Sequence, residues 1–199
     1  ALQKLSAAFA EGLTRALGDA HFLAADSRTT AYGAPRRLGV HITDVLPKSP
    51  EEAFEKKLVP ARIGLTETGE ATPAFSKKMA SLGISCPVSE LKRVNDGKQD
   101  QLVYEGVRPG VELADGLRTA LEAAVKHLPI PKVMTYQLAD GETTVSFVRP
   151  VRHLCALYGA DVVPVKLFGL ESGRETQGHR FHSQGLVEIP TADDYERVL

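Results

Sequence analysis

The stretch Ala34-Pro-Arg-Arg-Leu-Gly-Val-His-Ile42 decides the fold class, because it is the first segment with the pattern of a β-strand. Apolar residues at positions 38, 40 and 42 alternate with Gly39 and His41, and this period of two predicts a half-buried strand. Pro35 lies just ahead of the strand, where a missing backbone N–H does least harm to a sheet. The Arg36-Arg37 pair therefore lies at the start of a strand, where neighbouring side chains point to opposite faces.

Helical periodicity surrounds this strand. Apolar residues recur every three or four positions from Leu2 to Leu17 and predict a helix that ends near Gly18. A second helix is predicted over Val111–Leu128, where two prolines stop it. A shorter helix is predicted to start at Thr72-Pro73, with proline at its first position. Its apolar face comprises Phe75, Met79 and Leu82.

Short strands complete the predicted elements. They are expected at Gln101–Val107, Thr143–Val148 and Leu186–Ile189, with a hairpin joining Leu154–Tyr158 to Val162–Phe168. Ser49-Pro-Glu-Glu52 is interpreted as the cap of a short helix, Gly169–Gln184 as a loop, and Thr191–Asp194 as a capping box. Helices and strands are mixed irregularly and not as repeated β-α units, which indicates an α+β fold of mainly antiparallel sheets with packed helices.

Length and composition are typical of a globular chain. The 199 residues are 43% hydrophobic and 25% charged, with a net charge of −1. Two distant cysteines form neither a disulfide framework nor a zinc pattern, which suits a reducing cytoplasm. No apolar run approaches the length of a membrane span, so no membrane partner is expected.

Both ends of the chain resemble interrupted helical patterns. We therefore interpret residues 1–199 as a single fragment of a larger subunit, with an internal boundary expected, if anywhere, near residues 129–142.

Arginine is concentrated in three short segments of this nearly neutral chain: Ala34–Leu38, Phe147–Arg152 and Thr176–Phe181. A guanidinium group presents five donors in a rigid fork that suits phosphate and carboxylate oxygens. Several forks on one surface would bind a polyanion, and RNA is the candidate that we favour. Two other interpretations stay open: the Arg36-Arg37 pair as solvated charge at a strand end, and Arg149 and Arg152 as partners of carboxylates around the Pro150 kink.

The third segment, Gly178-His-Arg-Phe-His182, gives the sharpest loop pattern. His179 and Arg180 supply donors, and Arg174 precedes them in the same basic stretch. Phe181 is expected to be substantially buried and to anchor the loop, because burying a large ring contributes about 1.5–3 kcal/mol. The two histidines have no evident third ligand, so no metal site is predicted. No phosphate-cradling glycine loop, paired carboxylates or activated nucleophile is apparent, and no catalytic residue is predicted.

Four motifs in one order carry a family resemblance. They are Pro35-Arg36-Arg37-Leu38, Pro131-Lys132-Val133-Met134, Phe147-Val148-Arg149-Pro150 with Arg152, and Gly178-His179-Arg180-Phe181. In this order they resemble the N-terminal part of the β subunit of bacterial heterotetrameric glycyl-tRNA synthetases.

This resemblance implies a fold similar to the editing-like domain of the phenylalanyl-tRNA synthetase β subunit. It also implies two partners: tRNA-Gly and the α subunit, in a cytoplasmic heterotetramer of two α and two β subunits. The α subunit would hold ATP and Mg and activate glycine, and no cofactor is expected in this part of the β subunit. The residues expected to contact nucleic acid are Arg36, Arg37, Arg149, Arg152, Arg174, His179 and Arg180.

Two alternative roles remain at this stage. One is a hydrolytic editing pocket around His179 that acts on mischarged tRNA, although glycine has no smaller competitor that editing would need to remove. The other is a purely structural interface for the α subunit, with the arginines paired internally to carboxylates.

Overall fold

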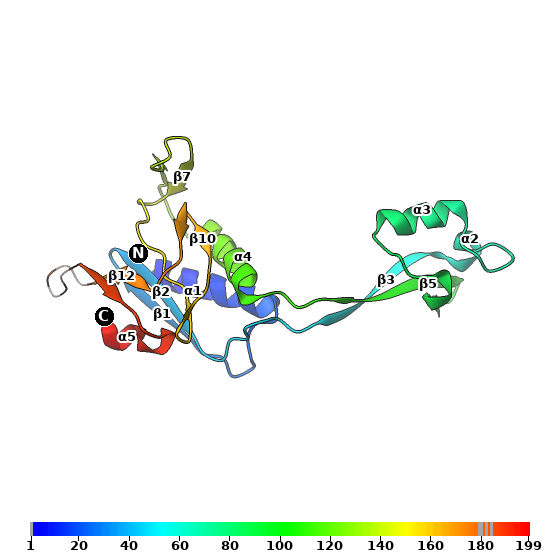
Figure 1. Cartoon of the computed structure of the whole chain (residues 1–199), viewed down its shortest axis with the longest axis horizontal. Helices are drawn as coiled ribbons and strands as arrows, with labels where there is room; N and C mark the ends of the chain where they lie inside the picture. Colours follow the sequence, from blue (N-terminus) through cyan, green and yellow to red (C-terminus); the bar gives the residue numbers. More distant parts are fainter. Residues whose placement is uncertain (1, 179–180, 182, 184) are drawn as a thin grey trace. The chain divides into compact units, whose positions relative to one another are not determined.

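The computed structural model describes residues 2–178, 181, 183 and 185–199, which form two compact units (Figure 1). Unit 1 comprises the chain up to Pro50 and from Val111 onward, and unit 2 is the intervening segment Glu51–Gly110. The segment 129–142, where an internal boundary was expected if anywhere, belongs to unit 1.

Two amphipathic helices form the centre of unit 1. Helix α1 (Leu2–Asp19) buries Leu13 and Leu17, and helix α4 (Leu113–Lys126) buries Leu113 and Leu121 in the same apolar cluster. Phe22, which follows α1, is 1% exposed in this cluster. The leucine periodicity of both segments therefore predicts the correct helices and their buried faces.

A β-hairpin packs beside α1. Strands β1 (Thr29–Ala34) and β2 (Arg37–Ile42) pair antiparallel from Thr29↔Ile42 to Ala34↔Arg37, and Pro35 and Arg36 form the two-residue turn. The strand predicted at Leu38–Ile42 is confirmed. Its partner β1 was not predicted, because the sequence of β1 has no apolar alternation and its burial pattern is almost entirely exposed.

Among its described residues, the rest of unit 1 comprises four small antiparallel hairpins and a short C-terminal helix. The hairpins are β6 (Met134–Gln137) with β7 (Thr144–Phe147), β8 (Leu157–Tyr158) with β9 (Asp161–Val162), β10 (Lys166–Leu167) with β11 (Leu170–Glu171), and β12 (Glu175–Gln177) with β13 (Leu186–Glu188). A 3-10 turn, η2 (Ala192–Asp194), then leads into α5 (Tyr195–Val198).

Two local predictions in this region are wrong. The stretch Gly169–Gln184 is not a continuous loop, because Gly169 with φ of 73° closes a tight β10–β11 turn and β12 follows. The capping box at Thr191 does not form either. The Thr191 hydroxyl donates to the Asp194 carboxylate at 2.8 Å, and the Asp194 N–H donates to the Thr191 backbone carbonyl.

Unit 2 has its own sheet and core. Strands β3 (Glu52–Pro60), β5 (Asp100–Arg108) and β4 (Lys92–Asn95) form an antiparallel sheet in the order β3-β5-β4. Helices α2 (Ala61–Gly64) and α3 (Pro73–Ser81) and the 3-10 turn η1 (Val88–Glu90) complete the unit. Its core is a cluster of the buried residues Leu58, Phe75, Met79, Ile84, Leu91 and Leu102.

The predicted helix after Ser49 is absent, because β3 begins at Glu52. The two ends of unit 2 pair from Glu52↔Arg108 onward, and Ser49 accepts the backbone N–H of Val111 at 2.7 Å instead of capping a helix. Helix α3 follows its prediction, since Thr72 accepts the Phe75 N–H and Pro73 opens the helix. Leu82, however, lies past the end of α3 and is 37% exposed.

The architecture is thus mixed α and β, with every named strand pair antiparallel, as the sequence pattern indicates. Within the described part of the chain, no helix combines the length and apolarity needed to cross a membrane.

The packing of Phe22 gives a test of this core. A Cβ added at Gly116 would approach the Phe22 ring far inside van der Waals contact. We expect Gly116→Ala to destabilise the protein by about 1–3 kcal/mol from overpacking, although alanine gains about 1 kcal/mol of helix propensity over glycine. Thermal or urea denaturation measures the change. Thr119→Ala, on the exposed side of α4, is the control, and equal stability of Gly116→Ala and wild type would contradict this packing.

Candidate nucleic-acid interface

The three arginine segments meet around strand β12. Leu154 and Ala156, which follow the Phe147–Arg152 segment, pair with Gly173, just ahead of β12. The Ala156 N–H donates to the Gly173 carbonyl, and the Gly173 N–H donates to the Leu154 carbonyl. At the other end of β12, Arg37 donates to the backbone carbonyl of Gln177. A three-residue strand extends only about 7–10 Å. Segments far apart in sequence are thus brought to one short strand.

Arg37 is committed to this architecture. Besides Gln177, its guanidinium interacts with the Tyr195 hydroxyl; burial raises the pKa of Tyr195, and the nearby Arg37 charge opposes that rise. Arg37 therefore ties the start of β2 to both β12 and the C-terminal segment, and its donors are directed toward the protein.

Arg174 is also structural. Its two terminal nitrogens donate to the backbone carbonyls of Ala160, at 2.8 Å, and Pro190, at 3.3 Å. It thereby joins the β8–β9 turn to the chain that leaves β13. The same guanidinium lies near Cys155, where burial raises the thiol pKa and the positive charge lowers it in part. Two donors of Arg174 are thus used inside the protein, and its contact with a nucleic acid stays a prediction.

Arg36, Arg149 and Arg152 are different. All three side chains are exposed, and none makes a hydrogen bond or ion pair with any residue that the structure describes. Arg36 lies in the β1–β2 turn beside Arg37. The carboxylate pairing considered for Arg149 and Arg152 is therefore not found among the described residues.

Arg152 borders a shallow hollow of about 450 Å³. Its lining combines Arg152, His153 and Arg174 with the carboxylates of Glu171, Glu175 and Glu188. Glu175 and Glu188 are direct cross-strand partners, an arrangement of like charges that is unfavourable by itself. Among the described residues these groups make no metal-binding cluster. The hollow is too acidic to attract a phosphate into its centre, so a phosphate would be held at the Arg152 rim.

The expected burial of Phe181 is wrong. Its side chain is 82% exposed, so it does not anchor the loop inside the protein. The hairpin is closed by backbone pairing of β12 with β13 and by Gly178, where any side chain would collide with Ser183 and Val187. The roles assigned to His179 and Arg180 lie outside the described residues.

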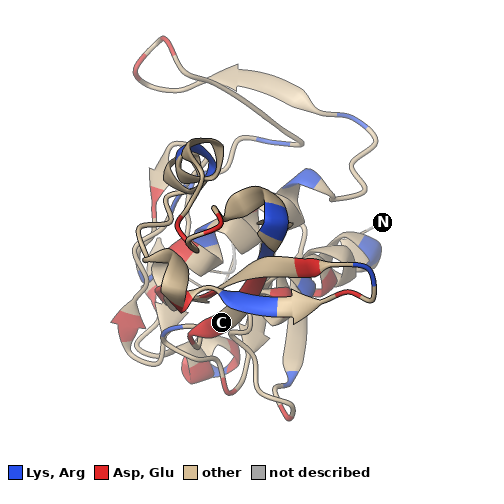
Figure 2. Cartoon of the chain, turned by 90° about the vertical axis from the view of Figure 1, so that its right-hand side faces the viewer, with Lys and Arg blue, Asp and Glu red and all other residues tan. Residues whose placement is uncertain are grey.

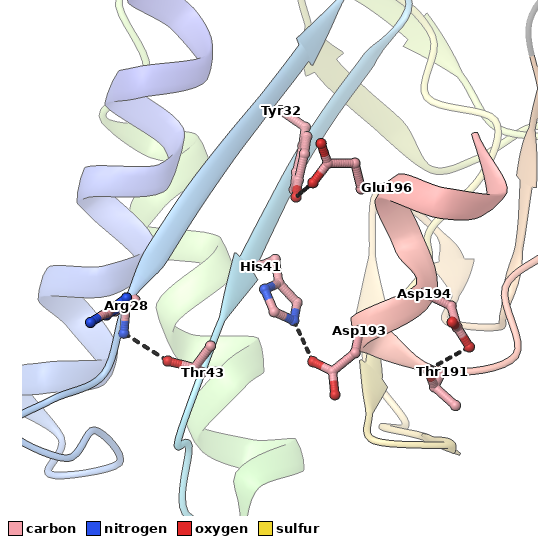
Figure 3. A network of polar contacts seen from close by, with 8 residues as sticks. All are labelled: Arg28, Tyr32, His41, Thr43, Thr191, Asp193, Asp194 and Glu196. Atoms are coloured by element: carbon pink, nitrogen blue, oxygen red, sulfur yellow. Dashed lines mark hydrogen bonds and ion pairs between the residues drawn. The ribbon is translucent and has the colours of Figure 1, made fainter.

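Sequence reasoning missed a polar seam beside Arg37, shown in Figure 3. The Tyr32 hydroxyl donates to Glu196 at 3.1 Å, and His41 Nε2 is 2.8 Å from the Asp193 carboxylate. Gly39 leaves room for Tyr195, since a Cβ there would lie 2.7 Å from the Tyr195 hydroxyl oxygen. A glycine within a strand was the available signal, because it often marks a close approach.

The seam positions the arginine segments. Burial and the Glu196 carboxylate raise the pKa of Tyr32, and the Thr191 hydroxyl and Arg197 lower the pKa of Asp194. The C-terminal segment is thereby fixed to the β1–β2 hairpin from which Arg36 projects.

A family model described as glycyl-tRNA synthetase beta subunit matches residues 1–199. The chain belongs to the glycyl-tRNA synthetase β-subunit family. Among curated relatives, the glycine–tRNA ligase beta subunits of Janthinobacterium sp. (strain Marseille) and Dechloromonas aromatica (strain RCB) are 49% and 48% identical to it. That of Acidovorax ebreus (strain TPSY) is 48% identical. Each alignment covers 100% of this chain but only 28–29% of the relative, so the chain spans less than a third of the length of these synthetase subunits.

The structural role of Arg174 can be measured directly. We expect Arg174→Gln to destabilise this glycyl-tRNA synthetase family chain by about 1–3 kcal/mol, because two backbone carbonyls lose a charged donor. Arg149→Gln, which removes an exposed guanidinium, should leave the melting temperature unchanged. Thermal melts of the two variants provide the comparison. Equal melting temperatures would contradict the structural role of Arg174.

Proposed function

We propose that this chain is a non-catalytic, tRNA-binding and assembly part of a glycyl-tRNA synthetase β subunit. It would support the attachment of glycine to tRNA-Gly by an α subunit that holds ATP and Mg, in a cytoplasmic heterotetramer. The observation that carries the proposal is that Arg37 and Arg152, from two segments far apart in sequence, lie beside β12 in the third, while the side chains of Arg36 and Arg152 are exposed.

The arginines divide into two sets by their partners. Arg37 and Arg174 donate to backbone carbonyls and hold the surface together. Arg36, Arg149 and Arg152 have no described acceptor, and each is exposed. An exposed guanidinium fork can take a phosphate bidentately without first breaking an internal ion pair. We therefore assign phosphate contacts to the second set.

Local charge, and not an overall field, would then drive RNA binding. The chain as a whole has a net charge of −1, and Glu171, Glu175 and Glu188 lie beside Arg152. Phosphates can be accepted only where a guanidinium projects beyond these carboxylates. Such an interface positions RNA at a few points and contributes only modest affinity by itself.

Salt dependence separates the phosphate-contact role from a structural one. We expect Arg149→Gln and Arg152→Gln each to weaken tRNA-Gly binding and to reduce the slope of log affinity against log salt by about 0.7–0.9, one phosphate contact each. Filter binding of tRNA-Gly across a salt series provides the measurement, with thermal melting as the check on folding.

Arg15→Gln is the matched control, because it removes one exposed positive charge that is already paired with Glu11 at 2.9 Å. Its slope should equal that of wild type. If Arg149→Gln and Arg152→Gln bind tRNA with unchanged affinity and slope, the purely structural interface replaces the tRNA-binding role.

The proposed role also implies that this chain does not activate glycine by itself. We expect the isolated chain to form no glycyl-adenylate, because the sequence supplies no phosphate-cradling glycine loop and the family resemblance assigns that chemistry to the α subunit. Glycine-dependent exchange of labelled pyrophosphate into ATP is the assay. Exchange by the purified chain, absent when glycine is omitted, would overturn the non-catalytic assignment.

A further inference from the structure

The segment of residues 148–153 carries two of the exposed arginines, yet its backbone is held at one point. Strand β7 ends at Phe147, and no named strand includes the segment. Pro150, in its middle, has no N–H to donate. Among the described residues, the backbone of this segment makes one hydrogen bond, in which the Val151 N–H donates to the Tyr136 hydroxyl at 3.2 Å.

This hydrogen bond lies between the two arginines. Arg152 follows Val151 directly and Arg149 precedes it by two residues, so the Cα atoms of both lie within about 7 Å of the Val151 Cα. Both arginine side chains are exposed and form no hydrogen bond or ion pair with a described residue. The anchored Val151 therefore limits the positions from which the two guanidinium groups project.

Tyr136 belongs to the half-buried face of the β6–β7 hairpin. It lies directly opposite Val145 in the register, and both side chains are half-buried, whereas Thr135 and Gln137 on either side of Tyr136 are exposed. Such alternation is that of a strand with one covered face. The ring is thus oriented by the hairpin, and its hydroxyl reaches the arginine segment that follows β7.

The β6–β7 hairpin is itself supported by the β10–β11 turn. Phe168 and Gly169 form this two-residue turn, with φ angles of 54° and 73°. A bulky side chain is strained at positive φ, and such strain persists only where the surroundings fix the residue. Here the Phe168 ring packs on the Phe147 ring, with centroids 4.8 Å apart, and a Cβ on Gly169 would collide with Leu138. These contacts hold the end of β7, where the arginine segment begins.

Exact placement matters because the charges of this chain are mixed. Its net charge is −1, and Figure 2 shows Lys and Arg interspersed with Asp and Glu. A polyanion is therefore not drawn to the chain by a strong overall field. Each contact requires a guanidinium within about 2.7–2.9 Å of a phosphate oxygen. If the binding conformation is populated only part of the time, the apparent affinity falls by that fraction.

We propose that Tyr136 is a positioning residue for tRNA binding. Its hydroxyl holds Val151 so that Arg149 and Arg152 are presented in one conformation, and that conformation takes the tRNA phosphates. This inference rests on the phosphate contacts proposed above for the two arginines. It adds a residue that acts through them and does not itself contact the RNA.

Tyr136→Phe removes the hydroxyl and keeps the ring. Because the binding conformation is then less populated, we expect tRNA-Gly affinity to fall about two- to tenfold, the factor that corresponds to the net contribution of one hydrogen bond. The bound state still contains both phosphate contacts, so the slope of log affinity against log salt should stay as in wild type. Arg149→Gln and Arg152→Gln, by contrast, each lower that slope. Filter binding across a salt series measures both quantities, with thermal melting as the check on folding.

Two comparisons show whether Tyr136 acts through the arginines. In a chain that already carries Arg149→Gln and Arg152→Gln, adding Tyr136→Phe should cause no further loss of affinity, since neither guanidinium remains to be positioned. Tyr158→Phe is the matched control, because it also removes a hydroxyl bonded to a backbone group, the Val45 carbonyl at 2.7 Å. Its tRNA affinity and salt slope should equal those of wild type.

Tryptic cleavage reports on the segment in the absence of RNA. Cleavage after Arg152 requires local opening of residues 148–153, and its rate follows the population of the open form. Tyr136→Phe should therefore speed this cleavage about two- to tenfold. Cleavage after Lys98, in the exposed β4–β5 turn of unit 2, is the internal reference and should not change.

The inference is overturned if Tyr136→Phe binds tRNA-Gly as tightly as wild type while the two arginine variants bind more weakly, a result that leaves the proposed function standing. It is also overturned if Tyr136→Phe causes the same loss of affinity in the presence of both arginine substitutions, or if it does not speed cleavage after Arg152. Unchanged affinity and slope in both arginine variants would instead remove the proposed function and overturn this inference with it.

Discussion

The packing of α1 against α4 around Phe22 is the interaction on which unit 1 depends. Apart from these helices, η2 and the four-residue α5, its named elements are strands of two to six residues in two-stranded sheets, which are marginal on their own in water. Ala156, Val163 and Val165, from the region of the small hairpins, are buried in the same cluster as the two helices. The helix pair therefore provides the apolar surface against which the short hairpins pack. This packing also positions the segments that carry the arginines.

Chemical type alone does not assign a role to an arginine in this chain. Arg36 and Arg37 are neighbours in one motif, yet one projects from a turn and the other donates to the carbonyl of Gln177. Arg152 and Arg174 line the same hollow, but of the two only Arg174 donates to described backbone carbonyls, those of Ala160 and Pro190. A guanidinium that saturates backbone carbonyls stabilises the fold, while one without an acceptor is available to a ligand.

Unit 2 shows how a small insertion acquires a core of its own. Its two ends are joined from Glu52↔Arg108 onward, so the chain leaves and re-enters unit 1 through adjacent antiparallel strands. Beyond Leu58, helix α3 and the loop around Ile84 cover the sheet with Phe75 and Met79. Before Leu58, β3 extends beyond the buried residues of that core, so one sheet has a covered and a largely exposed part.

The sequence by itself determined the elements whose signals are local. Leucine spacing sufficed for α1 and α4, proline and threonine for the start of α3, and alternation for β2, because each pattern reflects one element. The four motifs likewise sufficed for the family. Tertiary structure decided what depends on partners distant in sequence: β1 and β3 exist because β2 and β5 pair with them, although their own side chains are largely exposed. For the same reason the sequence could not show that Phe181 is exposed or that Tyr195 fits over Gly39. Nor could it show that Arg37 and Arg174 donate to backbone carbonyls of distant segments. Each of these outcomes follows from which backbone carbonyl or ring comes within contact distance after folding, and no local pattern encodes that distance.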